Sequence, residues 1–238
     1  GSTWVGGVAP GNGDTVSITH AITISDSRIV GTSPAEGNVV VNLNAAGSIH
    51  ITSTGYLKVR GDVIYTAGAG NTADAVLVDG GGIFEFDSSL AASPTSQNYA
   101  FYPSTTNGYR KFKVIGSKSA TATLKANASS GMGALKMNGQ AYGGSYTFSY
   151  ATLSNMSFET YYAHDAAKPI GWDVTYSTFS GCGLISDQDG VDPAGTFKHE
   201  HNYHTGTVGG VIFDFRILSY RSTGTRSIQY NVFDCQLS

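Results

Sequence analysis

From residue 15 onward, apolar and polar residues alternate in short runs, which is the pattern of half-buried β-strands. Val16 and Ile18 form one such run, and Ile49 and Ile51 form another. Each run is interrupted within a few residues by Gly, Asn, Asp or Ser, which favour turns. The chain is therefore predicted to be all-β, although an antiparallel sandwich would show the same local alternation.

A longer repeat in the C-terminal half distinguishes these folds. A frame of large, polar and aromatic residues recurs, and its third position falls at Tyr150, Tyr176, His201 and Tyr230. The period is thus in the middle twenties, which is typical of one coil of a solenoid. We predict a single-stranded right-handed parallel β-helix that forms one domain over residues 1–238. The first and third residues of the frame then point into the lumen, and the second points to solvent.

The N-terminal segment carries a family resemblance. The residues Trp4-Val-Gly-Gly-Val-Ala-Pro10-Gly-Asn-Gly-Asp14-Thr-Val-Ser-Ile18 resemble the opening of pectate-lyase-like β-helix proteins of bacterial surfaces and phages, and they are similar to the start of G8 domains. The resemblance implies an N-terminal cap and first coil over residues 1–25. Independently of any family, Trp4 is large enough to cover the open end of the core.

Two other segments complete the predicted outline. Residues 88–110 are the least periodic part of the chain, and we expect them to form a projecting loop. The repeat continues to the last residues. We therefore expect either a fragment of a longer protein or an end covered by neighbouring subunits, as in a homo-oligomer formed through coil ends.

Composition narrows the class of protein. The chain has 31 glycines and 13% charged residues, and it lacks both the Gly-X-Y period of collagen and the long Ala, Leu, Glu and Lys runs of helical repeats. Its net charge of −3, with no apolar run near 18 residues and no phosphate-binding glycine loop, predicts no nucleic-acid partner and no membrane span. We expect a secreted, cell-surface or virion protein.

The charges are unevenly distributed. No Asp or Glu occurs between Asp87 and Glu159, and this stretch contains Arg110, Lys111 and Lys113. These three side chains are candidates for binding an acidic polymer. The alternative is a solvated strand face whose counter-charges lie on neighbouring coils.

Three histidines cluster in the segment His199-Glu-His201-Asn-Tyr-His204. The repeat frame places His199 and His201 in the lumen and His204 just beyond the corner. Three imidazoles there could ligate a metal ion. The alternative is that they are core or corner histidines stacked on Tyr176 and Tyr230.

The same register predicts a polar ridge on the outer face of the solenoid, which consists of Asp173, Thr175, Ser177, Lys198, Glu200, Asn202, Gln229 and Asn231. In β-helix polysaccharide lyases and hydrolases such a ridge holds the acids and bases, and hydrolysis needs two carboxyl groups roughly 5–9.5 Å apart. Glu200, Asp173 and Lys198 are therefore the candidate catalytic residues, and the three amide side chains are candidates for ligand binding. The alternative is a solvated strand face.

A third group, Asp187, Asp189 and Asp192, surrounds a glycine. Hard oxygen ligands on a turn suit Ca²⁺, although an Asp-rich turn needs no ion. No cofactor is required by the sequence, and calcium is the one optional ion.

The two cysteines, Cys182 and Cys235, lie close to equivalent positions two coils apart. They are then separated by roughly 9–10 Å along the axis, beyond the Cα distance of about 7 Å that a disulfide allows. We expect two buried free thiols.

Two functions from different classes fit this sequence. The first is a non-catalytic structural or glycan-binding module of a secreted, cell-surface or phage protein, whose partner is a polysaccharide or cell-surface glycan. The second is a carbohydrate-active enzyme, either a polysaccharide lyase or a glycoside hydrolase, that acts on an acidic polysaccharide.

Overall fold

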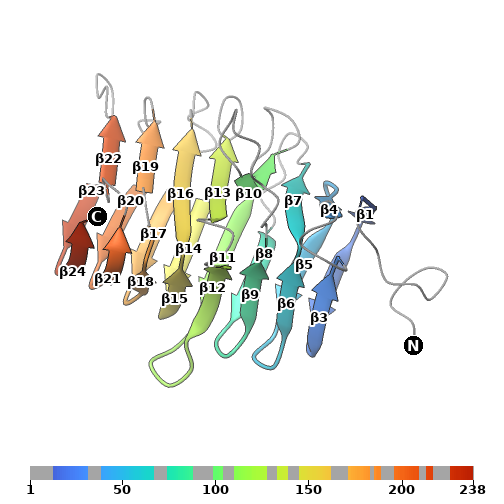
Figure 1. Ribbon diagram of the computed structural model, residues 1–238, viewed down its shortest axis with the longest axis horizontal. Helices are drawn as coiled ribbons and strands as arrows, with labels where there is room; N and C mark the ends of the chain where they lie inside the picture. Colours follow the sequence, from blue (N-terminus) through green and yellow to red (C-terminus); the bar gives the residue numbers. More distant parts are fainter. Residues whose placement is uncertain are drawn as a thin grey trace.

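The computed structural model describes residues 13–31, 39–66, 74–87, 99–103, 110–127, 133–138, 145–161, 171–182, 185–188, 196–208, 213–216 and 226–237. These residues form β-strands and no helix. The strands belong to three sheets of eight, and successive strands along the chain go to successive sheets. Figure 1 shows the result, in which three strands make one coil and the coils stack along one axis.

Each sheet takes every third strand. Sheet A contains β1 (Thr15–Ile18), β4 (Val39–Leu43), β7 (Gly61–Tyr65), β10 (Tyr99–Pro103), β13 (Gly133–Asn138), β16 (Met156–Tyr161), β19 (Ile185–Gln188) and β22 (Phe213–Arg216). Sheet B contains β2 (Ala21–Ile24), β5 (Ser48–Ile51), β8 (Asp74–Asp79), β11 (Lys111–Ile115), β14 (Ser145–Ser149), β17 (Gly171–Thr175), β20 (Thr196–Glu200) and β23 (Arg226–Gln229). Sheet C contains β3 (Ser27–Val30), β6 (Tyr56–Val59), β9 (Ile83–Phe86), β12 (Ala122–Ala126), β15 (Ala151–Ser154), β18 (Thr178–Ser180), β21 (Tyr203–Val208) and β24 (Val232–Leu237).

All neighbouring strands of the three sheets pair in parallel, and the predicted parallel β-helix is confirmed as an all-β solenoid. The register agrees with the repeat frame, because Val174 lies opposite Phe148 on one side and opposite His199 on the other. The right-handed sense stays a prediction. No helix in the described residues is long and apolar enough to cross a membrane.

The lumen is filled by side chains that alternate with outward polar residues along each strand. Its filling changes along the axis. The first coils bury Ile and Val, such as Val41 and Ile49, whereas the later coils stack aromatic rings. Trp172, for example, packs against Phe148 and Phe197 with ring centroids 5.8 Å away in each case. Sequential coils thus bury a continuous core that no single coil could provide.

Glycine is required where one turn crosses another closely. A Cβ atom at Gly55 would overlap the carbonyl oxygen of Ile24 on the preceding coil, and one at Gly47 would overlap that of Ile18. These contacts fix the short turns between sheets A and B and between sheets B and C in the early coils.

Two predicted segments fall partly outside the described residues. Within 88–110, residues 99–103 form β10 of sheet A, so the expectation of an uninterrupted loop is wrong there, and 88–98 and 104–109 lie outside. Within 1–25, β1 and β2 belong to the first coil, and the predicted cap at 1–12, with Trp4, lies outside.

Candidate functional site

An exposed column of aromatic rings marks the corner between sheets B and C. Tyr150, Tyr176, His201 and Tyr230 follow β14, β17, β20 and β23, and their φ angles are 47°, 50°, 57° and 56°. The left-handed region is uncommon for such bulky residues. It turns the third residue of the repeat frame out of the lumen, so the prediction that His201 points inward is wrong.

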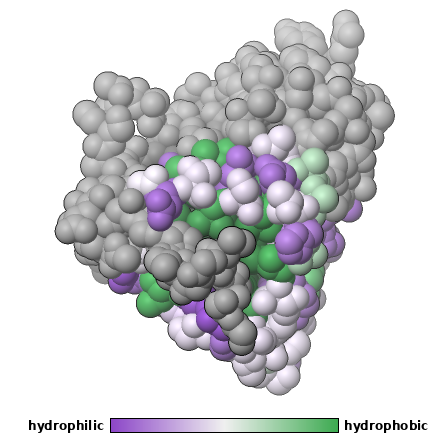
Figure 2. All heavy atoms as spheres, turned by 90° about the vertical axis from the view of Figure 1, so that its right-hand side faces the viewer, coloured by the Kyte–Doolittle hydropathy of each residue, from purple (hydrophilic) through white to green (hydrophobic). Residues whose placement is uncertain are grey.

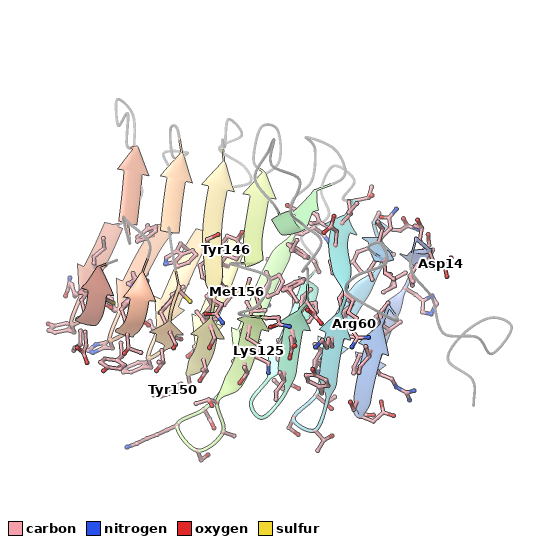
Figure 3. The ribbon with its side chains drawn as sticks, viewed as in Figure 1. Asp14, Arg60, Lys125, Tyr146, Tyr150 and Met156 are labelled. Carbon is pink, nitrogen blue, oxygen red and sulfur yellow. The ribbon has the colours of Figure 1, made fainter. Side chains whose placement is uncertain are left out.

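These four side chains, the corner ladder, stack face to face along the solenoid. The ring centroids of Tyr150 and Tyr176 are 5.0 Å apart, and His201 lies 4.8 Å from both Tyr176 and Tyr230, with interplanar angles of 5–12° along the column. Tyr176 is 49% exposed and Tyr230 is 71% exposed. Figure 3 places Tyr150 at the outer edge of the ribbon and Tyr146 between the sheets. The stacking of His201 on two tyrosines confirms the alternative interpretation of that residue.

A second column, made of asparagine side chains, lies inside the corner. These side chains form hydrogen bonds with backbone groups that have no strand partner at this turn. Asn202 accepts a hydrogen bond from the Ser177 amide (2.9 Å) and donates one to the Val174 carbonyl (3.1 Å). One coil later, the Asn231 side chain accepts a hydrogen bond from the backbone amide of Asn202 and donates one to the His199 carbonyl. Ser177 and Asn202 are buried, and Asn231 bonds the same kind of backbone groups inside the corner, so the prediction that these three side chains point to solvent with the ridge is wrong. The side-chain amide of Asn202 instead stabilises the corner by pairing with these backbone groups.

The predicted ridge on sheet B lies on the outer face, directly before the corner ladder. Asp173, Lys198 and Ser227 occupy one register position on three successive coils, and Thr175, Glu200 and Gln229 occupy the position two residues further on. Lys198 Nζ lies 3.8 Å from a Glu200 oxygen, and the Ser227 hydroxyl donates to the other oxygen. The three predicted catalytic residues are therefore brought together on neighbouring coils, with Asp173 and Glu200 one coil apart.

Arg110, Lys111 and Lys113 do not form a common exposed surface. Arg110 is fully buried and donates to the carbonyl oxygens of Ala45 (2.7 Å) and Gly47, so the expectation that it meets a ligand is wrong. Burial lowers the pKa of its guanidinium. Lys113 forms an ion pair of 2.9 Å with Asp74 on the neighbouring strand, which is the arrangement of the alternative interpretation. Lys111 is half-buried at the start of β11.

Inside the lumen, His199 and His204 form a hydrogen-bonded pair. The Trp172 indole donates to His199 Nδ1 at 3.2 Å, so His199 carries its proton on Nε2 and donates it to His204 Nε2 at 2.8 Å. Burial, with a smaller contribution from His204, lowers the pKa of His199 to about 3, and burial lowers that of His204 to about 4. Both are neutral core histidines, and His201 does not converge with them.

The remaining candidates are the three aspartates of the predicted calcium site and the two cysteines. Asp187 lies in β19, its side chain is outside the described set, and Asp189 and Asp192 are outside the described residues. Among the side chains that are described, no three His, Cys, Asp or Glu groups could hold a metal ion. Cys182 and Cys235 are unpaired, as predicted. Only Cys182 is buried, which raises the pKa of its thiol to about 12.

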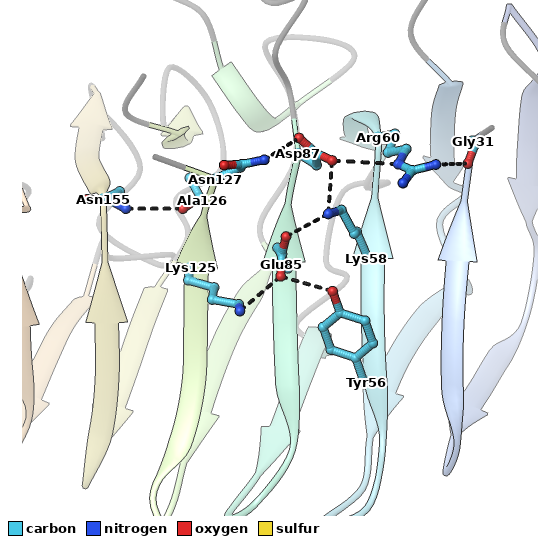
Figure 4. A network of polar contacts seen from close by, with 10 residues as sticks. All are labelled: Gly31, Tyr56, Lys58, Arg60, Glu85, Asp87, Lys125, Ala126, Asn127 and Asn155. Atoms are coloured by element: carbon cyan, nitrogen blue, oxygen red, sulfur yellow. Dashed lines mark hydrogen bonds and ion pairs between the residues drawn. The ribbon is translucent and has the colours of Figure 1, made fainter. Parts of the chain in front are cut away.

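A dense polar cluster that was not predicted lies on sheet C. This ion network consists of Tyr56, Lys58, Arg60, Glu85, Asp87, Lys125 and Asn127, on three adjacent coils (Figure 4). Lys58 Nζ lies 2.9 Å from Glu85 and 3.0 Å from Asp87, and Lys125 Nζ lies 3.0 Å from Glu85. Its signal in the sequence was the outward position shared by Lys58, Glu85 and Lys125, which appears only once the coils are aligned.

The charged side chains of this network neutralise one another. Partial desolvation works to raise the pKa of Glu85, but the hydrogen bonds from Lys58, Lys125 and Tyr56 outweigh it and lower the pKa. The pKa of Asp87 is likewise lowered, despite desolvation, by bonds from Lys58 and Asn127. The pKa of Lys58 is raised because the same two carboxylates outweigh its own desolvation. At neutral pH Glu85 and Asp87 therefore offer no protonated carboxylic acid, and Lys58 offers no neutral amine base.

No family model, curated protein or solved structure matches this chain.

Proposed function

We propose that this chain is a non-catalytic β-helical module of a secreted, cell-surface or virion protein, and that it binds a polysaccharide along the corner between sheets B and C. The observation that carries the proposal is the exposed corner ladder beside the polar columns of sheet B. Both repeat once per coil over the same coils.

The chemistry of these columns suits a sugar polymer. The faces of the inner rings are occupied by one another, so the corner ladder presents ring edges and phenolic hydroxyls to solvent. Thr175, Glu200 and Gln229 supply hydroxyl, carboxylate and amide groups immediately before the corner. Tyrosine combines an apolar ring with a hydroxyl that can form hydrogen bonds, which is why it is enriched at binding interfaces.

The spacing adds a second argument. Equivalent residues recur at the strand spacing of about 4.8 Å. This is comparable with the length of one sugar unit in an extended polysaccharide, so a periodic polymer meets the same contact on each coil. Individually weak contacts then add through multivalency.

The test is a binding measurement on a panel of neutral and acidic polysaccharides, by affinity electrophoresis and calorimetry. Asn tolerates the left-handed region, so Tyr176→Asn removes a ring without straining the corner. Losing aromatic contacts worth about 1 kcal/mol predicts roughly fivefold weaker binding. Tyr203→Asn is the matched control, because it also removes an exposed tyrosine ring, but on the face of sheet C, and it should leave binding unchanged. Equal binding by the Tyr176→Asn variant and the wild type would exclude the corner ladder as the site.

The enzymatic alternative is supported by the proximity of Asp173, Lys198 and Glu200 on one outer face. The same polysaccharides are incubated with the protein, with and without Ca²⁺, while reducing ends and the absorbance of unsaturated uronates are followed. Turnover that Glu200→Gln abolishes, with binding retained, would establish the enzyme and overturn the non-catalytic proposal. The proposal predicts no turnover.

A further inference from the structure

The outer faces of the described coils carry polar side chains, while the apolar ones fill the lumen. Figure 2, which faces the end with β1, β2 and β3, shows hydrophobic residues gathered at the centre of that face and polar residues around them. The same alternation of buried and outward residues runs along the strands beside the corner ladder. A polymer bound there meets these outward side chains, so their charges determine whether acidic sugars are attracted or repelled.

Three carboxylates flank the corner ladder from Tyr176 onward. Asp173 and Glu200 point outward from sheet B on two neighbouring coils, directly before the corner. Asp234 lies beyond the corner, exposed on sheet C, where it accepts a hydrogen bond from the Tyr203 hydroxyl. Negative charge therefore lies on both sides of the exposed rings.

Positive charge is scarce beside these carboxylates. From β14 to β24, Lys198 is the one lysine or arginine whose side chain the structure describes. Its Nζ lies 3.8 Å from a Glu200 oxygen, and Asp173 is its register partner on the preceding coil, so carboxylates offset its charge. The lysines of β11, β12 and the turn between them lie two coils before Tyr176, about 10 Å along the axis. This exceeds the screening length of about 8 Å at physiological ionic strength.

The other groups on this surface suit sugar hydroxyls. Thr147, Thr175 and Gln229 face outward on sheet B, and Thr152 and Thr178 do so on sheet C. Hydroxyl and amide groups both donate and accept hydrogen bonds, as sugar hydroxyls do, and neither needs a counter-charge. An acidic sugar at the same place would set its own carboxylate against those of the protein.

We propose that the polysaccharide bound along the corner ladder is uncharged, and that Asp173, Glu200 and Asp234 disfavour acidic polysaccharides. This selectivity rests on the proposed function, because it describes the ligand of the same site. Two like charges about 4 Å apart in water weaken binding roughly fivefold. An acidic polymer whose repeating carboxylates meet Asp173 and Asp234 should therefore bind at least fivefold more weakly than its uncharged counterpart.

Pairs of polymers that differ in charge alone test the selectivity on the full chain. Suitable pairs are methyl-esterified and free galacturonan, dextran and carboxymethyl dextran, and hydroxyethyl and carboxymethyl cellulose. Calorimetry is run with a chelator, so that no divalent cation bridges the two sets of carboxylates. In each pair that binds, the uncharged polymer should bind at least fivefold more tightly at low salt, and the difference should shrink as salt rises.

Charge-removing variants identify the carboxylates responsible. Asp173→Asn and Asp234→Asn should each raise the affinity for the acidic polymer roughly fivefold and leave that for the uncharged one unchanged. Asp79→Asn is the matched control, because it removes a half-exposed carboxylate of sheet B three coils before Asp173, about 14 Å away along the axis. It should leave both affinities unchanged.

The outcomes separate this selectivity from the proposed function. Acidic polymers that bind as tightly as uncharged ones, with binding still weakened by Tyr176→Asn, would overturn the selectivity and leave the proposed function standing. An Asp173→Asn variant that rejects acidic polymers as strongly as the wild type does would also overturn it. If no polymer of the panel binds, or if Tyr176→Asn has no effect on binding, the proposed function fails and the selectivity fails with it.

Discussion

Acidification should destabilise this protein through the buried pair His199 and His204. Both imidazoles are neutral in the folded state, with the Trp172 indole and each other as hydrogen-bond partners. Their pKa values are lowered to about 3 and about 4 from an ordinary value of 6.5. Unfolding exposes both rings to water, where they bind protons below pH 6.5. The unfolded state is therefore favoured as the pH falls from 6.5 toward the folded pKa values.

The size of the effect follows from the pKa differences. At pH 5 the folded protein still holds both rings neutral, whereas the unfolded chain is almost fully protonated at these positions. Each histidine then costs about 2 kcal/mol relative to pH 7. The pair can thus remove a large part of the 5–15 kcal/mol that is typical of a folded domain.

Urea unfolding followed by circular dichroism between pH 7 and pH 5 measures this loss. This window avoids the ion network, because the lowered pKa values of Glu85 and Asp87 keep both carboxylates charged at pH 5. The matched control is His201→Asn, which removes an exposed imidazole and should retain the full pH dependence.

The decisive variant is the double substitution His199→Phe with His204→Phe. A phenyl ring at 204 continues the stack between Phe179 and Phe233, whose centroids lie 4.5 and 4.7 Å from the His204 ring. Loss of the acceptor for Trp172 should cost about 1–3 kcal/mol at every pH. The difference between pH 7 and pH 5 should nearly vanish. A wild type that is equally stable at both pH values, or a double variant as acid-sensitive as the wild type, would refute this reasoning.

Four further substitutions test the contacts that hold the coils together, each by urea unfolding. Glu85→Gln leaves two lysines without their shared carboxylate and should cost about 2 kcal/mol, less in high salt; a variant as stable as the wild type would show that the ion network contributes nothing. Asn202→Ala leaves a buried amide and carbonyl unpaired and should cost about 1–3 kcal/mol, whereas an unchanged midpoint would mean that water replaces the side chain. Gly55→Ala should destabilise the protein severely, because the new Cβ would overlap the backbone of the preceding coil. Gly171→Ala should be milder, because its Cβ would meet only the Ser145 Cβ, at 3.1 Å. Equal stability of the two variants would contradict the close crossing at Gly55.

The fold was predictable from the sequence because the residues that stack on one another in the lumen recur regularly along the chain. Phe148, Val174 and His199 recur at almost constant spacing, and the structure places them in one column. A parallel coil needs only this period and the alternation of buried and exposed positions.

The outward turn at the corner was not predictable from that pattern. Tyr176 and His201 are large and sit among buried neighbours, so alternation assigns them to the lumen. Their left-handed backbone is rare for such residues, and ring stacking between coils and the Asn202 side chain accompany it. These contacts exist only between coils. The sequence of a single coil does not contain them.

The ion network was not predicted from the sequence, for a related reason. Lys58 and Glu85 are 27 residues apart, but Lys125 follows Glu85 by 40, because residues of varying number separate the strands of the middle coils. Without a constant spacing, the alignment of these charges depends on knowing where each coil begins. The ridge of Asp173, Lys198 and Glu200 lies where spacing is regular, and its register was predicted correctly.

The most direct test of the proposed function is tyrosine nitration, read by mass spectrometry, with and without a polysaccharide that the protein binds. Tyr176 lies in the middle of the corner ladder, and Tyr203 lies on sheet C with a hydrogen bond to Asp234. Both are accessible in the free protein, at 49% and 39% exposure. A glycan along the corner between sheets B and C predicts that Tyr176 is protected and Tyr203 is not. Unchanged nitration of Tyr176 in the saturated complex would contradict the account.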